Sequence, residues 1–214
     1  MKVKICGITR LDEALMSIEF GADLLGFNFY PKSPRFITPA AARVIVQQIG
    51  SIDRRPTLVG VFVNSSLVEI QAMLNSVDLD LAQLHGGEPV MTVARLNHRA
   101  FKALRPTSIE EADAEWYAPY GPAAPALLID AYRSDRFGGT GHQADWSIAA
   151  KIALAYPILL AGGLTPDNVA EAIAQVQPWG VDVASGIESM PGRKDVQKLR
   201  AFIEAAKRYE SVKS

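Results

Sequence analysis

The chain alternates short apolar runs with helix-like stretches, and this alternation recurs eight times along its length. The apolar runs are four to six residues long and mostly lack polar alternation. That pattern is typical of strands buried on both faces of a parallel sheet. Each step from one run to the next leaves room for one strand, one helix and two short loops. The predicted strands are residues 3–6, 24–27, 58–63, 81–84, 100–104, 126–129, 158–161 and 181–184.

Helices are predicted between these strands from hydrophobic periodicity and capping residues. Gly21 is a typical stop after the first periodic stretch, and Thr38 followed by Pro39 is a typical helix start. Thr165 and Pro166 repeat that start. The predicted helices are residues 11–20, 40–49, 66–74, 89–96, 109–116, 146–155, 166–176 and 195–209.

Eight strand–helix units account for the whole chain, so we predict one domain over residues 1–214. Within the α/β class, eight units favour a single closed (β/α)8 barrel, the TIM barrel. An open doubly wound sheet is the structural alternative. Such a sheet usually has five or six strands and a glycine-rich phosphate loop after the first one. Here Cys6-Gly7-Ile8-Thr9 follows the first strand, and this is not that loop.

Charge and composition argue against several kinds of partner. The 22 Lys and Arg residues nearly balance the 23 Asp and Glu residues. Proteins that bind nucleic acid or membrane surfaces usually carry a basic excess, so we expect neither partner. One cysteine excludes an intramolecular disulfide, and the three histidines do not have zinc-site spacing. No apolar run reaches the ~18 residues of a membrane span and no signal peptide is recognisable, so we expect a cytoplasmic protein without a metal.

Two ionisable residues end predicted strands, which is where barrel enzymes place their chemistry. Cys6 ends the first strand and Asp130 ends the sixth. A thiol at this rim could act as a nucleophile or a general base, and a carboxylate beside an apolar core suits a general acid. Position alone equally allows Cys6 as a small buried apolar residue and Asp130 as a turn or cap residue.

A histidine and an arginine follow two other predicted strands. His85 stands before two glycines, where it either hydrogen-bonds within its loop or lines a site. Arg35 lies in a loop stiffened by two prolines. A held guanidinium can bind a carboxylate or phosphate through two bonds, although loop arginines are commonly solvated. We expect this loop to lie nearly opposite the loops after the seventh and eighth strands.

Glycine-rich turns follow three late strands in succession. Glycine lets backbone N–H groups approach an anion closely, and the loops after strands seven and eight often bind phosphate in barrels. One such turn would be weak evidence, because turns generally favour glycine. Three in succession predict a phosphate site formed by Gly139, Gly141, Gly162, Gly163, Ser185 and Gly186.

Ordered motifs extend over residues 2–195 and cover seven of the eight units. They include Lys4-Ile5-Cys6-Gly7-Ile8-Thr9, Gly26-Phe27-Asn28-Phe29, Ser33-Pro34-Arg35, Val61-Phe62-Val63-Asn64, Gln83-Leu84-His85-Gly86, Leu160-Ala161-Gly162-Gly163-Leu164, Asp182-Val183-Ala184-Ser185-Gly186-Ile187-Glu188 and Pro191-Gly192-Arg193-Lys194-Asp195. In these motifs the chain resembles the phosphoribosylanthranilate isomerase family of tryptophan biosynthesis. Residues 97–125 and the last helix match weakly.

The resemblance implies a cofactor-free Amadori rearrangement by general acid–base catalysis. N-(5-phosphoribosyl)anthranilate would become 1-(2-carboxyphenylamino)-1-deoxyribulose 5-phosphate. By this resemblance Asp130 is the acid and Cys6 is the base. Arg35 would bind the anthranilate carboxylate, the glycine turns would bind the phosphate of this small substrate, and His85 and Asp182 would line or support the site. The state of assembly, monomer or homodimer, is left open.

Two other functions compete with this one. A dual isomerase that also serves histidine biosynthesis would have a similar fold, but such enzymes carry an aspartate where Cys6 stands. A catalytically silent phosphate-binding barrel is the other alternative. It would have no need for Cys6, Asp130 and Arg35 together.

Overall fold

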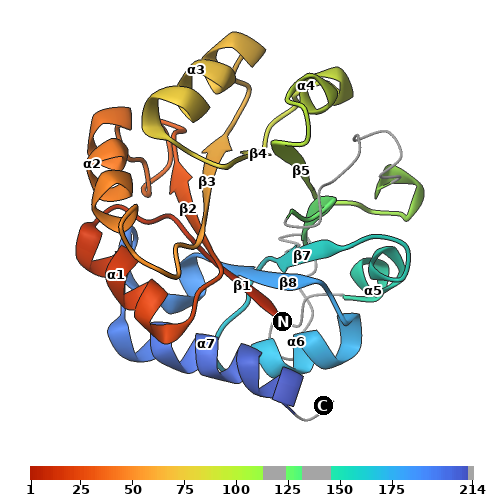
Figure 1. The fold of residues 1–214 in the computed structure, drawn as a ribbon. Coiled ribbons are helices and arrows are strands. Elements are labelled where there is room, and N and C mark those ends of the chain that lie inside the picture. The colour runs from red at the N-terminus through yellow and green to blue at the C-terminus, as the bar shows by residue number, and fades with distance from the viewer. Residues whose placement is uncertain (113–123, 132–145, 212–214) are drawn as a thin grey trace.

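Eight parallel strands form a closed barrel in the computed structural model, which describes residues 1–112, 124–131 and 146–211 (Figure 1). The strands follow one another around the ring in chain order, and the eighth pairs with the first. This confirms the TIM barrel and rules out the open sheet. The strands are β1 (Lys2–Cys6), β2 (Leu24–Asn28), β3 (Thr57–Phe62), β4 (Leu81–Leu84), β5 (Ala100–Leu104), β6 (Leu127–Asp130), β7 (Ile158–Ala161) and β8 (Gly180–Val183).

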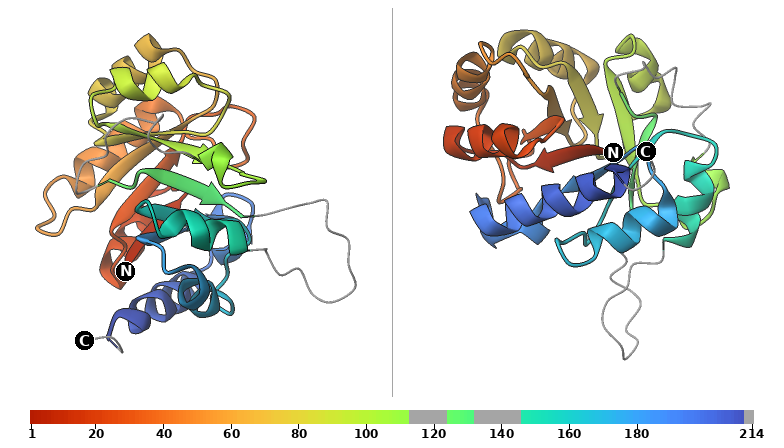
Figure 2. Two further views of the ribbon diagram at one scale, coloured as in Figure 1. Left: turned by 90° about the vertical axis from the view of Figure 1, so that its right-hand side faces the viewer. Right: turned by 60° about the horizontal axis from the view of Figure 1, so that its bottom comes forward.

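Helices surround this barrel on its outside (Figure 1). The last helix packs between the first and the sixth, which closes the outer ring, and its C-terminal end lies on the same side of the molecule as the N-terminus (Figure 2). None of the described helices is long and apolar enough to cross a membrane. The helices are α1 (Leu11–Phe20), α2 (Pro39–Ile49), α3 (Leu67–Val77), α4 (Val90–Arg95), α5 (Ser147–Ala153), α6 (Val169–Val176) and α7 (Val196–Ser211), with 3₁₀ turns η1 (Glu110–Ala112) and η3 (Ser185–Ile187).

The local signals for helix ends are largely confirmed. The Thr38 hydroxyl accepts a hydrogen bond from the Ala41 N–H at 3.3 Å, with Pro39 as the first helical residue of α2. Gly21 ends α1 with a φ of 103°, a left-handed conformation that glycine adopts readily.

Four segments differ from the sequence predictions, and one of them is α3, which ends at Val77 instead of residue 74. Helix α6 begins three residues later than predicted, because the Asn168 side chain accepts the Thr165 N–H at 2.8 Å and holds a separate turn there. The helix predicted over residues 109–116 is a 3₁₀ turn within its described part. Strands β9 (Glu188–Met190) and β10 (Arg193–Lys194) form an antiparallel hairpin after β8 that was not predicted, since runs this short carry no clear periodicity.

The barrel interior changes from apolar to polar along the strands. One buried cluster fills the interior near the strand starts with side chains such as Leu24, Leu81 and Leu128. Alternate residues of a strand share a face, so the next interior positions are Gly26, Gln83 and Asp130. A larger apolar layer lies between the strands and the helices. The polar end of the interior therefore coincides with the carboxyl ends of the strands.

Candidate active site

A cavity of about 470 Å³ opens at the carboxyl ends of the strands. Every predicted site residue within the described ranges lines it, whereas Gly139 and Gly141 lie outside the described residues. The fold therefore gathers residues that are up to 180 positions apart along the chain. The lining residues are Cys6, Asn28, Arg35, Val61, Gln83, His85, Arg105, Asp130, Ala161, Gly162, Gly163, Leu164, Asp182, Val183, Ala184, Ser185 and Gly186.

Cys6 is a buried thiol at the end of β1, with 8% of the residue exposed. It pairs across the strands with Gly26 of β2, where a Cβ atom would lie 3.0 Å from the Cys6 sulfur and 3.1 Å from Lys4 Nζ. Glycine at this position therefore leaves room for both groups. Burial raises the pKa of the Cys6 thiol above its ordinary value, and the charge of Lys4 partly offsets this effect.

Lys4 and Asp182 form a buried ion pair beneath Cys6. Lys4 Nζ lies 2.7 Å from Asp182 Oδ1, and the lysine side chain is fully buried. Burial alone would lower the pKa of Lys4, but its interactions with Asp182 and Cys6 together outweigh burial and raise the pKa above its ordinary value. Asp182 was predicted to line or support the site, and its observed partner is Lys4. The sequence analysis quoted Lys4 in a motif but gave it no role.

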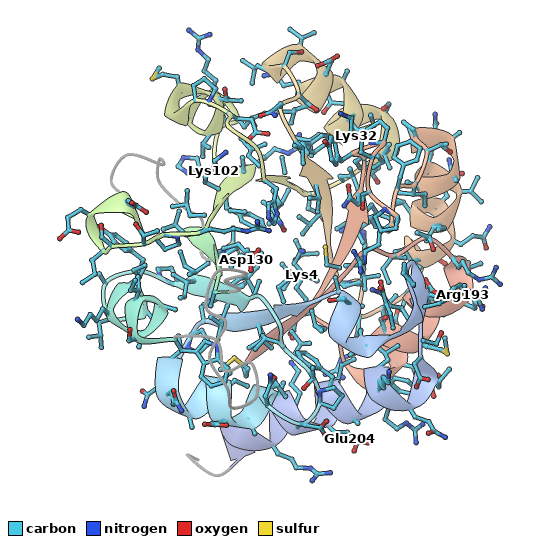
Figure 3. The ribbon with its side chains drawn as sticks, turned by 180° about the vertical axis from the view of Figure 1, so that it is seen from behind. Lys4, Lys32, Lys102, Asp130, Arg193 and Glu204 are labelled. Atoms are coloured by element: carbon cyan, nitrogen blue, oxygen red, sulfur yellow. The ribbon has the colours of Figure 1, made fainter. Side chains whose placement is uncertain are left out.

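Asp130 ends β6, three strands away from β1 around the ring. Figure 3 shows it, like Lys4, in the middle of the barrel. Arg105 Nε donates a hydrogen bond to Asp130 Oδ2 at 2.8 Å, from a side chain that is 66% exposed. Arg105 was missed by the sequence analysis, although it directly follows β5. Applying the strand-end rule to that strand would have found it.

His85 follows β4 and hydrogen-bonds within its own segment. Gln83 Nε2 lies 2.9 Å from His85 Nδ1. An amide nitrogen only donates, so Nδ1 accepts and the ring proton lies on Nε2. Burial lowers the pKa of His85, against the charges of Asp130 and Asp182, which favour protonation. Gln83 was also missed, and its position two residues before His85 on the same face was the available signal.

Arg35 takes part in a charge network that joins the loop after β2 to the hairpin of β9 and β10. Its Nε and Nη2 atoms donate to the two carboxylate oxygens of Glu188 at 2.8 and 2.7 Å. Lys194 Nζ lies 3.1 Å from the same carboxylate, and these two cations lower the pKa of Glu188 despite its burial. The expectation that the Arg35 loop lies opposite the β8 loop was wrong. A closed ring of eight strands brings β2 within two strands of β8.

The glycine turns after β7 and β8 pack directly against each other. A Cβ atom on Gly186 would lie 1.8 Å from the Leu164 carbonyl oxygen, so only glycine fits at this contact. Gly162 and Gly163 have φ values of 95° and 67°, which favour glycine as well. These two turns therefore form one continuous backbone surface at the cavity. Among the described residues no three His, Cys, Asp or Glu side chains gather in a metal-binding arrangement.

The closed barrel and the ionisable side chains at its strand ends define a (β/α)8-barrel enzyme. The family model described as N-(5'phosphoribosyl)anthranilate (PRA) isomerase matches residues 3–205. The chain therefore belongs to the phosphoribosylanthranilate isomerase family.

Individual relatives match over nearly their whole length. The N-(5'-phosphoribosyl)anthranilate isomerase of Geotalea uraniireducens is 49% identical over 207 residues, which are 96% of this chain and 98% of the relative. The crystal structure of the Thermotoga maritima isomerase is 38% identical, with a TM-score of 0.84 over 97% of this chain and 99% of that one. A further isomerase, solved with reduced 1-(o-carboxyphenylamino)-1-deoxyribulose 5-phosphate, is 37% identical, with a TM-score of 0.81 and coverage of 97% and 99%.

Proposed function

We propose that this chain isomerises N-(5'-phosphoribosyl)anthranilate in tryptophan biosynthesis by general acid–base catalysis in the described cavity. One observation carries the mechanism. Cys6 and Asp130 reach a single cavity from strands three apart in the ring, so that a base and an acid approach one substrate from different sides. Two opposed proton-transfer groups are what this rearrangement requires.

In the proposed steps the two catalytic groups move one proton each, the final tautomerisation moves a third from the C2 hydroxyl to C1, and no other reactant is consumed. Asp130 protonates the furanose ring oxygen, and the C1–O bond breaks as the ring opens to a Schiff base. The Cys6 thiolate then removes the proton at C2, which gives an enolamine that tautomerises to the ketone. Asp130 supplies one proton, Cys6 takes one, and the tautomerisation only relocates one, so the product is an isomer of the substrate.

The two anionic ends of the substrate have separate proposed partners. The turns after β7 and β8 would bind the phosphate through Gly162, Gly163, Ser185 and Gly186, with Gly139 and Gly141 completing that site. Arg35 would bind the anthranilate carboxylate. Its two bonds to Glu188 use Nε and Nη2, which leaves Nη1 outside that pair. The ligand in one solved relative carries both a carboxyphenyl group and a 5-phosphate in its name, which supports this division.

A turnover assay with freshly generated N-(5'-phosphoribosyl)anthranilate tests the function. The anthranilate group is fluorescent, so conversion is followed by the fluorescence change. We expect turnover by the purified protein, and no turnover would leave a silent barrel. Turnover of the aminoimidazole carboxamide substrate of histidine biosynthesis as well would instead support a dual isomerase.

Three further expectations concern the domain organisation, the cellular location and the state of assembly. We propose a single catalytic domain over residues 1–214 and a cytoplasmic location, which suits an enzyme of amino-acid biosynthesis. A Thermotoga maritima relative is described as dimeric. Light scattering of the purified protein decides between monomer and homodimer.

A further inference from the structure

We propose that Lys4 is a positioning residue that acts through Cys6, as the fixed cation that stabilises the Cys6 thiolate. The inference rests on the proposed role of Cys6 as the base. It assigns a task to a fully buried lysine that the proposed acid–base steps do not use.

Strand geometry places the two side chains next to each other. Lys4 and Cys6 are two residues apart on β1, so both point into the barrel. The Lys4 nitrogen and the Cys6 sulfur each lie about 3 Å from the same point beside Gly26. Figure 3 shows Lys4 in the middle of the barrel, in contrast to Glu204 on its outer rim. Because Gly26 has no side chain, no side chain at this position of β2 separates the ammonium from the sulfur.

Asp182 keeps the ammonium in this place. The register of β1 on β8 sets Lys4 directly beside Asp182, and the 2.7 Å bond fixes one of the three ammonium donors. A buried lysine without such a partner would tend to lose its charge. The carboxylate thus holds Lys4 both in position and in its charged form, and the remaining donors are available to the thiolate.

Other charged groups near Cys6 are engaged elsewhere. Lys194 Nζ donates to the Cys6 carbonyl oxygen at 2.6 Å, but its charge is paired with Glu188. Arg35 is bound to the same carboxylate through two bonds. Across the cavity lie His85 and Asp130, and the latter is paired with Arg105. Lys4 is therefore the cation whose position and free donors suit the sulfur of Cys6.

The direct test is the titration of the Cys6 thiol in Lys4→Met. Cys6 is the single cysteine of the chain, so the pH dependence of alkylation by iodoacetamide reports on this thiol alone. We expect the midpoint to rise by about 1–3 pH units, the usual effect of losing an opposite charge within contact distance. The limb of the kcat/KM profile that reports the ionisation of Cys6 should move to higher pH with it. An unchanged midpoint would overturn the proposal.

A double variant guards against the effects of an unpaired Asp182. Lys4→Met leaves that carboxylate buried alone, which destabilises the fold and itself disfavours the thiolate. Lys4→Met/Asp182→Asn removes both charges. We expect its alkylation midpoint to lie between those of the wild type and the single variant. A midpoint equal to that of the wild type would mean that the effects of the Lys4 and Asp182 charges on the Cys6 thiol cancel, and the proposal would be wrong.

Lys102→Met is the matched control. Lys102 is a buried lysine on β5, on the opposite side of the ring, and it pairs with Glu88. We expect this variant to keep the wild-type alkylation midpoint. An equal shift would show that loss of any buried lysine suffices, which contradicts a specific role of Lys4. Full activity in Cys6→Ser would show that Cys6 is not the base. The titration of the thiol in the Lys4 variants would still show whether Lys4 stabilises the thiolate.

Discussion

The two sides of the cavity hold their ionisable groups in different ways. On the Cys6 side, Lys4 and Lys194 are fully buried and each is paired with a buried carboxylate. On the opposite side, Asp130 is paired with Arg105, whose side chain is 66% exposed, whereas the buried Lys102–Glu88 pair there does not line the cavity. Cys6 therefore lies among buried ion pairs, whereas the cation paired with Asp130 is in contact with water.

The difference distinguishes charged groups that the fold holds in fixed positions from a pair that solvent can rearrange. Buried charges interact strongly because little water screens them, and they cost much to break. Exposed pairs contribute little to stability because solvent competes for both partners. Breaking an ion pair on the Cys6 side should therefore destabilise the fold, while replacing Arg105 beside Asp130 should change its stability little.

The largest expected effect is on catalysis, where both sides should matter equally. Cys6→Ser and Asp130→Asn keep the shapes of the side chains but remove the proposed base and acid. We expect kcat in the fluorescence assay to fall by about 10²–10⁴-fold in each. Substrate affinity should be roughly retained. A kcat near the wild-type value in either variant would remove that residue from its proposed role.

The next effect concerns stability, where the two sides should differ. Glu188→Ala leaves Lys194 buried with only backbone partners, and we expect a loss of about 3–5 kcal/mol in the free energy of unfolding. Arg105→Ala should cost about 1 kcal/mol or less. Urea unfolding followed by circular dichroism measures both. Equal losses in the free energy of unfolding would show that the buried and the exposed ion pairs do not differ in their contribution to stability.

A third effect tests the contact between the late glycine turns. In Gly186→Ala the new Cβ atom would overlap the Leu164 carbonyl oxygen, so both turns must shift. A displacement of about 1 Å is enough to weaken binding severalfold to a hundredfold, and we expect the inhibition constant of a phosphate-bearing product analogue to rise accordingly. Gly87→Ala is the control, since its Cβ atom would meet nothing closer than 3.6 Å. Unchanged inhibition in Gly186→Ala would contradict the phosphate assignment.

Arg35 links the buried network to the proposed substrate carboxylate. A charge-assisted hydrogen bond contributes about 1.5–3 kcal/mol, so Arg35→Met should weaken binding of the carboxylate-bearing product analogue about ten- to a hundredfold. An analogue that lacks the carboxylate but keeps the phosphate should bind almost as it does to the wild type. Equal losses for the two analogues would show that Arg35 serves the network with Glu188 instead.

The smallest effect is a pH dependence on the more exposed side. Burial lowers the pKa of His85 in the folded state, so the unfolded chain binds the proton more tightly. The free energy of unfolding should therefore fall as the pH drops below about 6.5, by at most about 1.4 kcal/mol per pH unit. His85→Gln should flatten this slope between pH 7 and 5. A slope identical to that of the wild type would exclude His85 as its source.

Much of the fold follows from local sequence patterns. The eight strands were predicted within one residue at every end, because a strand buried on both faces leaves a continuous apolar run. Placing Cys6, Asp130 and His85 at strand ends also needed only this pattern. The hairpin after β8 and the late start of α6 depend on short contacts, such as that of Asn168, which no periodicity reveals.

The partners of the site residues were decided by the tertiary structure alone. Lys4 and Asp182 are 178 positions apart, and Arg35 and Glu188 are 153 apart. The sequence determined by itself which residues end the strands and face the interior, since strand periodicity is local. Which of those residues meet depends on the register in which β8 closes onto β1, and that register is set by the packing of the whole ring.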